Sequence, residues 1–213
     1  MIFIIGWRGE PGIKDEPQHI FQGEITLELL DLLKIKTFIV DRDTREEELE
    51  LTMTKFDKLL SQGKSVAFII KKNALAYENT IKYENQYQMT REEIIKQIVN
   101  VSKTDPIVST TGKSSRELFE TRKEKGQSNQ YDFLTVGSMG HSSSIALGVA
   151  FNKANRKIWC IDGDGAALMH LGAMAVIGAA CPSNLVHILI NNNAHETVGE
   201  MPTVSKTVDW VGL

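Results

Sequence analysis

The feature that most constrains the fold is the alternation of short apolar runs with helical patterns in the second half of the chain. The apolar runs have the length of buried strands, and the stretches between them repeat apolar residues at helical spacing. This alternation predicts βαβ units, hence an α/β fold with a parallel sheet flanked by helices. The expected strands are Ile107–Thr110, Phe133–Val136, Lys157–Ile161 and Leu185–Ile190, and the expected helices are Ser114–Lys123, Ser142–Asn155 and Ala166–Ala180.

The first 72 residues show a shorter version of the same alternation. A buried strand is expected at the start of the chain. A capping box of Thr44 and Glu47 predicts the start of a helix that ends at Gly63. The other expected elements are strands Ile2–Ile5, Thr37–Val40 and Val66–Ile70, a helix over Glu24–Lys34, and an inner face of the capped helix formed by Leu49, Met53, Phe56 and Leu60.

A polar stretch separates the two α/β regions. Residues 73–88 carry three tyrosines and no clean periodicity, which is typical of a linker. Thr90 and Glu93 form a second capping box, and a helical face of Ile94, Ile95, Ile98 and Val99 follows. We therefore expect a first domain over residues 1–72, a linker over 73–88 and a second domain over 89–213.

Composition and charge exclude several classes of protein. The net charge of −3 and the pI of about 6.0 give no basic field for a nucleic acid. The opening apolar run of five residues, Met1 to Ile5, is too short for a signal peptide or a membrane span. Cys160 and Cys181 lie in apolar stretches without metal-ligand spacing, so we expect two reduced core residues and a cytoplasmic protein.

Two strand ends carry oxygen ligands. Gly163-Asp164-Gly165 follows one expected strand, and Asn191-Asn192 follows the next. Carboxyl ends of adjacent parallel strands meet at one edge of a sheet, where ligands bind. Glycines at a helix start let backbone N–H groups approach a phosphate, and carboxylate and amide oxygens suit Mg²⁺. The pattern predicts a site for a metal ion and a diphosphate.

Two other phosphate motifs fit poorly. A dinucleotide fingerprint needs a third glycine where Leu168 stands, and an acidic residue about 20 residues further on, which is missing. The segment Thr111-Gly112-Lys113-Ser114 resembles the end of a P-loop, but Ile107 replaces the first glycine. Neither a dinucleotide site nor an ATPase site is expected.

Five segments carry a family resemblance. Gly163–Gly165 and Asn191–Asn192 resemble the signature of thiamine-diphosphate enzymes, and Thr110–Lys113, Gly137–His141 and Gly6–Gly12 narrow the similarity to the phosphonopyruvate decarboxylase family. The resemblance runs over the whole chain. It implies a thiamine-diphosphate-binding fold and the decarboxylation of 3-phosphonopyruvate to phosphonoacetaldehyde and CO₂, with thiamine diphosphate and Mg²⁺ as cofactors.

The resemblance also implies roles for individual residues. Asp164, the Asn192 side chain and the Ala194 carbonyl would bind Mg²⁺. The diphosphate and the rings of the cofactor would lie against the residues that follow the strand ends. These cofactor-binding residues are Thr111, Gly112, Gly137, Ser138, Met139, Gly163, Asp164, Gly165, Ala166 and Asn192.

Titratable residues near these turns are candidates for catalysis. His195 and Glu196 follow the metal loop and could move protons, and His141 follows the Gly137–Gly140 turn. A phosphonate group on the substrate favours cationic contacts. The charged first loop offers Arg8, Lys14 and His19 for them, although ion pairs within that loop are an equally good interpretation.

Relative to the family, both domains are expected to be incomplete. Residues 1–72 correspond to the later half of a pyrimidine-binding domain, without the glutamate segment, so the isolated chain is expected to be inactive. The expected partners are a 2-keto acid substrate and further copies of the chain in a homo-oligomer, with no nucleic acid and no membrane. Alternatives are a sulfopyruvate or other 2-keto acid decarboxylase, or a non-catalytic remnant.

Overall fold

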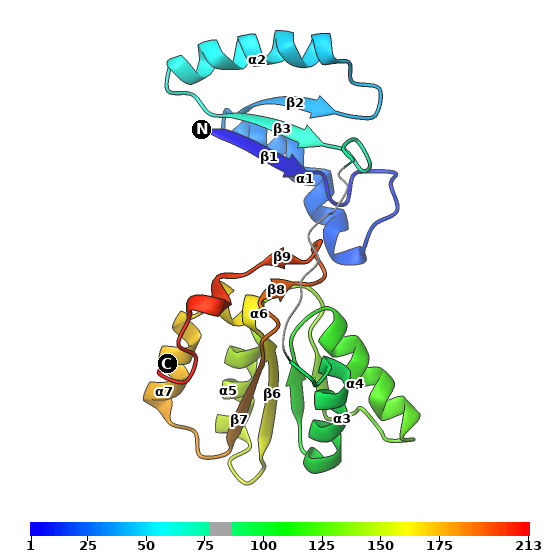
Figure 1. The fold of residues 1–213 in the computed structure, drawn as a ribbon, viewed down its shortest axis with the longest axis vertical. Helices are drawn as coiled ribbons and strands as arrows, with labels where there is room; N and C mark the ends of the chain where they lie inside the picture. The colour runs from blue at the N-terminus through cyan, green and yellow to red at the C-terminus, as the bar shows by residue number, and fades with distance from the viewer. Residues whose placement is uncertain (77–86) are drawn as a thin grey trace. The chain divides into compact units, whose positions relative to one another are not determined.

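The computed structural model describes residues 1–76 and 87–213, which form two compact units, Met1–Lys82 and Tyr83–Leu213 (Figure 1). The predicted linker, residues 73–88, falls largely on residues 77–86, which lie outside the described residues. The assignment of residues 1–72 to half of a pyrimidine-binding domain stays a prediction.

The first unit contains a three-stranded parallel sheet in the order β1-β3-β2. Neighbouring residues of the central strand point to opposite faces. Ala67 and Ile69 contact α1, whereas Phe68 packs against Phe56 of α2 with the ring centroids 5.0 Å apart. The elements are β1 (Ile2–Gly6), η1 (Pro17–His19), α1 (Ile20–Leu32), β2 (Lys36–Val40), α2 (Glu46–Ser61) and β3 (Val66–Ile70).

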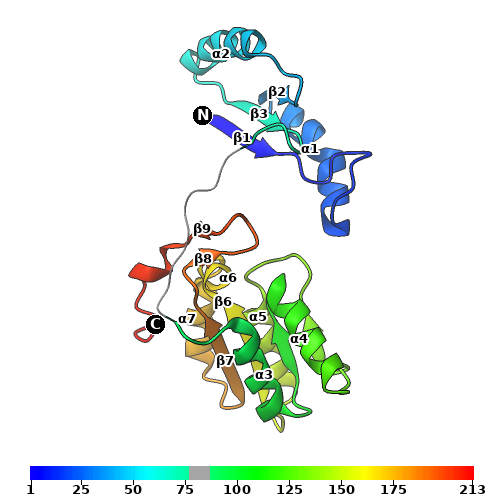
Figure 2. The ribbon, with the colours of Figure 1, turned by 45° about the vertical axis from the view of Figure 1, so that its right-hand side comes forward.

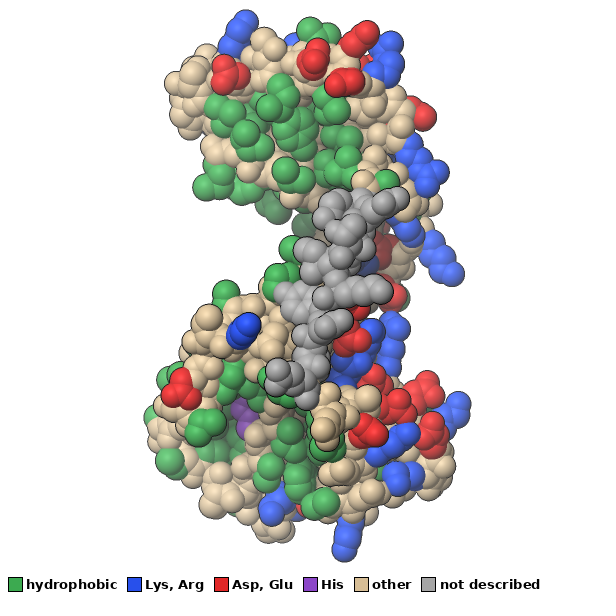
Figure 3. Space-filling view, in the orientation of Figure 1, with side chains coloured by type: hydrophobic (Ala, Val, Ile, Leu, Met, Phe, Trp, Pro, Cys, Tyr) green, Lys and Arg blue, Asp and Glu red, His purple; other side chains and the backbone are tan. Residues whose placement is uncertain are grey.

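The first strand differs from the expectation of a buried strand. β1 pairs with β3 along one edge and alternates exposed with half-buried residues. Ile2 and Ile4 are 45% and 74% exposed, on the sheet face where α2 packs against the other two strands. Hydrophobic side chains gather on the face of this unit seen in Figure 3. An apolar run alone cannot separate an edge strand from a central one.

The capping box predicted from Thr44 and Glu47 is wrong by one residue. The N-cap of α2 is Arg45, and the Glu48 carboxylate lies 3.5 Å from the Arg45 backbone nitrogen. Thr44 instead donates to Asp41 Oδ1 at 3.0 Å, because the preceding turn engages its hydroxyl. Met53, expected on the inner face, is 49% exposed.

The second unit contains a four-stranded parallel sheet in the order β5-β4-β6-β7, as the alternation predicts. A short antiparallel pair, β8 and β9, follows the last strand. The elements are α3 (Arg91–Ser102), β4 (Ile107–Ser109), α4 (Lys113–Glu124), β5 (Asp132–Leu134), α5 (Ser142–Asn152), β6 (Ile158–Gly163), α6 (Asp164–Met169), α7 (Gly172–Ala180), β7 (Leu185–Ile190), β8 (Ala194–His195), β9 (Met201–Pro202) and η2 (Val204–Thr207).

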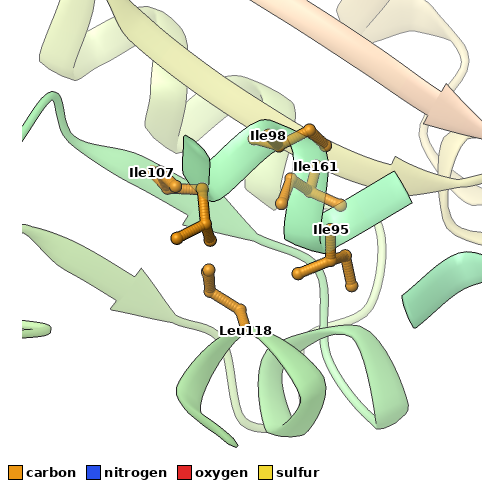
Figure 4. Close-up of a cluster of buried hydrophobic side chains, with 6 residues drawn as sticks. Ile95, Ile98, Ile107, Leu118 and Ile161 are labelled. Atoms are coloured by element: carbon orange, nitrogen blue, oxygen red, sulfur yellow. The ribbon is translucent and has the colours of Figure 1, made fainter. Parts of the chain in front are cut away.

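Helices cover both faces of this sheet (Figure 2). On one face α3 and α4 pack on the strands through Ile95, Ile98, Ile107, Leu118 and Ile161 (Figure 4). On the other face α5 covers a second buried cluster that includes Cys160. The predicted capping box at the start of α3 is confirmed, since Thr90 Oγ1 accepts from the Glu93 backbone nitrogen at 3.2 Å and Glu93 accepts from the Thr90 backbone.

Two predictions about this unit are wrong in detail. The helix expected over Ala166–Ala180 is split into α6 and α7 at His170, whose backbone leaves the helical region. Cys181 was expected in the core but is exposed, because it lies just past the end of α7 in a left-handed conformation. Among the described residues, no helix is both long and apolar enough to cross a membrane.

Candidate cofactor and metal site

The two motifs at the strand ends lie side by side. β6 and β7 are paired along their whole length, and Gly163 stands opposite Ile190. Asp164 and Asn191 are therefore the next residues after two paired strand ends, Gly163 and Ile190. Both line a cleft of about 970 Å³ at the carboxyl ends of the strands of the second unit. This is the edge of a parallel sheet at which ligands bind.

Asp164 is the first residue of α6 and is 2% exposed. Thr203 Oγ1 donates to Asp164 Oδ2 at 2.5 Å. A buried carboxylate is costly unless hydrogen bonds or a cation compensate its charge. The start of α6 offers partial positive charge to the Asp164 carboxylate. Together with the Thr203 hydroxyl it compensates only part of the negative charge, so a cation can bind this carboxylate as well.

The Asn191–Asn193 turn supplies the neighbouring oxygen atoms. Asn192 Oδ1 accepts from the Ala194 backbone nitrogen at 3.1 Å, and Asn191 Oδ1 accepts from Asn193 at 3.0 Å. These side chain to backbone bonds fold the loop tightly, and Asn193 adopts a left-handed conformation at φ 59°. Asn192 and Ala194 line the same cleft as Asp164.

The starts of two helices lie at this cleft. Gly112, at φ 87°, is the N-cap of α4, and Lys113 and Ser114 line the cleft. Thr110 Oγ1 also belongs to the lining and is buried, without a hydrogen-bond partner among the described residues. Free backbone donors at a helix start, together with an unpaired hydroxyl, suit a phosphate group.

His195 lies against the glycine that follows Asp164. A Cβ atom built on Gly165 would lie 2.4 Å from His195 Cε1, so a larger residue there would require the imidazole to move. This close contact explains the second glycine of the Gly163–Gly165 motif. It also places a titratable ring at the start of α6, inside the cleft lining.

Glu196 belongs to a network of charged groups at the cleft. Its carboxylate pairs with Arg91 and with Lys113, and Glu117 holds Arg91 from the other side at 2.7 Å. Burial acts to raise the pKa of Glu196, but the hydrogen bonds from both cations outweigh it, so its pKa lies below the ordinary value. An ionised carboxylate is a poor proton donor at neutral pH, which favours a binding role for Glu196 over an acid role.

The glycine-rich turn after β5 is less close to the cleft. Met139 lines it, whereas Gly137, Ser138 and His141 do not, and neither does Gly112. His141 Nδ1 lies 3.1 Å from the Ser138 carbonyl oxygen. The structure therefore brings together Thr111, Met139, Gly163, Asp164, Gly165, Ala166, Asn192, Ala194, His195 and Glu196, and leaves four predicted residues outside the lining.

Two of the three cationic residues predicted for the first loop, Arg8 and His19, are engaged within the first unit. Arg8 pairs with Asp15 at 2.6 Å, and His19 Nδ1 lies 3.1 Å from the same carboxylate. Hydrogen bonds from Arg8, the Gly9 backbone and His19 hold the pKa of Asp15 well below its usual range. The Lys14 carbonyl oxygen accepts from Lys72. This geometry matches the ion-paired interpretation of the loop.

Sequence reasoning missed three residues of the site: Arg91, Glu117 and Thr203. Arg91 contacts Glu196 across 105 positions of sequence, and Thr203 contacts Asp164 across 39. No local pattern connects residues so far apart. Arg91 carries only the signal of a first helical residue after the Thr90 cap.

The second unit matches a family of known proteins. Residues 110–209 match the family described as thiamine pyrophosphate enzyme, C-terminal TPP binding domain, where TPP is another name for thiamine diphosphate. Phosphonopyruvate decarboxylase of Streptomyces viridochromogenes is 33% identical over 98% of this chain and 55% of its own length. The chain is thus similar to phosphonopyruvate decarboxylases over nearly its whole length. The resemblance stated from the sequence and the thiamine-diphosphate-binding fold are thereby confirmed.

Other relatives extend the comparison. Phosphonopyruvate decarboxylase of Streptomyces hygroscopicus is 32% identical over 98% of this chain and 54% of its own length. Sulfopyruvate decarboxylase subunit beta of Methanocaldococcus jannaschii is 40% identical over 53% of this chain and 57% of its own length. The chain spans about half the length of the phosphonopyruvate decarboxylases that it matches.

Proposed function

We propose that this chain provides the diphosphate- and Mg²⁺-binding part of a thiamine-diphosphate-dependent decarboxylase of 3-phosphonopyruvate. The observation that carries the proposal is the buried Asp164 carboxylate, which lines one cleft with Asn192 on the neighbouring strand end. Its oxygen chemistry fits a hard divalent cation. The match of residues 110–209 to a TPP binding domain supports the same site.

The residues present fit both groups. Asp164 Oδ, Asn192 Oδ1 and the Ala194 carbonyl would hold Mg²⁺, and the unpaired Thr110 hydroxyl and the start of α4 would receive phosphate oxygens. Met139 would contact a cofactor ring, as it lines the cleft with a flexible apolar side chain. In the proposed site, Gly112, Gly137 and Ser138 act by shaping the turns that border the cleft.

The chemistry divides between the cofactor and the chain. When bound, thiamine diphosphate supplies the sink for the electrons that remain when CO₂ leaves a 2-keto acid. The chain's own residues bind and orient. Gly165 leaves room for the His195 imidazole beside the metal ligand, where the ring can hold or accept a proton. Glu196 fixes Arg91 and Lys113 at the cleft, where an anionic substrate would compete with Glu196 and Glu117 for these two cations.

Calorimetric titration of thiamine diphosphate with and without Mg²⁺ tests the cofactor site. We expect Mg²⁺-dependent binding to the wild-type chain and its loss in Asp164→Ala, which removes a metal ligand. Asp105→Ala is the matched control, because Asp105 precedes β4 at the opposite end of the sheet and does not line the cleft. Equal binding by wild type and Asp164→Ala contradicts the proposed site.

The second candidate substrate is sulfopyruvate. The identity to a sulfopyruvate decarboxylase beta subunit is 40% over 53% of this chain, and the identity to a phosphonopyruvate decarboxylase is 33% over 98% of this chain. Phosphonate and sulfonate groups accept similar cationic contacts. CO₂ release from each acid by the complete, cofactor-loaded decarboxylase to which this part would belong separates the two, and we expect the faster turnover with 3-phosphonopyruvate.

We also propose that the chain forms a homo-oligomer and acts in the cytoplasm, where its two free cysteines stay reduced. Phe21, Leu29 and Leu32 of α1 are 46–77% exposed, and grouped apolar side chains are typical of an interface. Light scattering should give a mass of at least twice 23.8 kDa. Leu32→Glu should lower it, whereas Lys34→Glu, just past the end of α1, should not. A monomeric wild-type chain contradicts association.

A further inference from the structure

A segment near the end of the described chain covers the metal loop. It comprises residues 201–210 and is called here the covering segment. Its strand β9 pairs antiparallel with β8, so that Met201 stands opposite His195 and Pro202 opposite Ala194. The Thr203 backbone nitrogen continues the contact by donating to the Asn193 carbonyl oxygen at 2.9 Å. The covering segment thus follows the loop that carries two proposed metal ligands.

Thr203 joins this segment to Asp164. Its hydroxyl donates to Asp164 Oδ2 at 2.5 Å and accepts from the Ser205 backbone nitrogen at 3.3 Å. A threonine hydroxyl has one proton. Because the Ser205 N–H group occupies a lone pair, the proton is directed to the carboxylate. This is the hydrogen bond that the described residues give to the Asp164 side chain.

A second set of bonds fixes the covering segment on the other side of the loop. Ser205 is 1% exposed, and its hydroxyl donates to Asn191 Oδ1 at 2.9 Å. Trp210 Nε1 donates in turn to Ser205 Oγ at 2.8 Å. Asn191 begins the turn that holds Asn192 and Asn193. Ser205, whose backbone N–H donates to the Thr203 hydroxyl, is therefore itself fixed by Asn191 and Trp210.

We propose that Thr203 is a positioning residue for the metal centre, which orients the Asp164 carboxylate by occupying Oδ2 and leaving Oδ1 for the cation. The inference rests on the proposed function, because it requires Asp164 to be a metal ligand. Carboxylate ligands are commonly fixed by hydrogen bonds from outside the ligand set, and removal of such a partner weakens metal binding about 10- to 100-fold. Neither covalent chemistry nor contact with the substrate is assigned to Thr203.

The test compares three variants of the 213-residue chain. Thr203→Val keeps the shape and removes the donor, and Thr203→Ser restores the donor. Thr207→Val is the matched control, because Thr207 lies in the 3₁₀ helix that Thr203 caps, is exposed, and donates to the Val204 carbonyl oxygen instead. The readout is Mn²⁺ binding, measured from the electron paramagnetic resonance signal of the free ion, with and without thiamine diphosphate.

We expect Thr203→Val to weaken Mn²⁺ binding about tenfold or more, Thr203→Ser to bind like the wild type, and Thr207→Val to show no change. Unchanged Mn²⁺ affinity in Thr203→Val, with binding lost in Asp164→Ala, overturns this inference and leaves the proposed function intact. Equal binding by wild type and Asp164→Ala overturns both. If circular dichroism shows that Thr203→Val is unfolded, Thr203→Ala takes its place, with the same expected and contradicting results.

Discussion

The first unit, Met1–Lys82, and the second unit, Tyr83–Leu213, are both parallel α/β structures, yet they bury their apolar side chains to different extents. In the second unit helices cover both faces of the sheet, and the two clusters there are nearly solvent-free. In the first unit α1 buries Leu30 at 7% exposure but leaves Leu32 at 77%. The same kind of sequence pattern therefore produces two nearly solvent-free clusters in the second unit and an exposed apolar face on α1 of the first, while α7 of the second unit also has no buried residue.

Apolar periodicity therefore predicts a helix or a strand, but not which segment packs against its apolar face. The interior strands β4 and β6 have neighbours on both edges, whereas β1 has a single described neighbour. Exposed apolar surface is left where a partner would bind. The second unit, in contrast, has buried polar residues that line the cofactor cleft, Asp164 and Thr110 among them. Substitutions that compare the two units should thus differ strongly in their cost.

The largest difference is expected between two arginines. Arg122 and Asp132 are buried in the second unit and make two hydrogen bonds of 3.0 and 3.1 Å. Arg122→Ala leaves a buried charge unpaired and should lower the free energy of unfolding by about 3–5 kcal/mol. Arg8→Ala in the first unit removes a pair whose arginine is 62% exposed and should cost less than about 1 kcal/mol.

Urea titrations with tryptophan fluorescence measure this difference unit by unit. Trp7 reports on the first unit, and Trp159 and Trp210 report on the second. Burial raises the pKa of Asp132, against the opposing hydrogen bonds of Arg122. A protonated carboxyl needs no cation, so the cost of Arg122→Ala should shrink as the pH falls towards the pKa of Asp132. A cost for Arg8→Ala equal to that for Arg122→Ala would contradict the comparison.

The next difference concerns two leucines. Leu118 is fully buried between α3 and α4, and Leu118→Ala should cost about 2–5 kcal/mol through lost contacts and a cavity. Leu32→Ala should change the free energy of unfolding by less than about 0.5 kcal/mol. Leu30→Ala changes the helix propensity of α1 in the same way, but Leu30 is buried. The difference between the two variants therefore measures the effect of burial. The same titrations apply, in protein dilute enough to be monomeric, and a large cost for Leu32→Ala under that condition would contradict the prediction for an exposed side chain.

The parts of the fold that could be predicted are those whose sequence signal lies within the element itself. The bounds of β3, Val66–Ile70, and of β7, Leu185–Ile190, agree with the sequence prediction because each is a compact apolar run between polar turns. The start of α2 was misplaced because Asp41 competes for the hydroxyl of Thr44. No residue pattern shows that competition before the turn is formed.

The site was predictable to the same degree. Asp164 and Asn192 could be placed together because a parallel sheet brings consecutive strand ends to one edge. Thr203, which binds Asp164, and Arg91, which binds Glu196, could not be predicted, because both lie far from their partners in the sequence. The predicted roles of His141, His195 and Glu196 in catalysis stay predictions. The ion pairs of Glu196 lower its pKa, which favours a binding role for this residue over an acid role.

A smaller difference is expected between two helix starts. Thr90 caps α3 with its hydroxyl, and Thr90→Ala should cost about 0.5–2 kcal/mol. Arg45 at the start of α2 offers no side-chain oxygen, and Arg45→Ser would complete a capping box with Glu48. That substitution should raise the free energy of unfolding of the first unit by about 0.5–1 kcal/mol. A loss of stability in Arg45→Ser would mean that the Arg45–Glu48 ion pair outweighs a cap.

The smallest effect on stability is expected at Cys181, and it provides a probe of the core of the second unit. Cys181→Ser should change the free energy of unfolding by less than about 0.5 kcal/mol, because the side chain is exposed. Thiol labelling of the wild-type chain at pH 8 should modify Cys181 quickly and Cys160 slowly. Cys160 is buried within β6, and burial raises its pKa above the usual range, so it reacts only when the strand opens. Both cysteines lie in the second unit. A slow labelling rate of Cys160 that increases with urea as the unit unfolds would show that the core around β6 is closed. Fast labelling of both cysteines would contradict a closed core in the second unit.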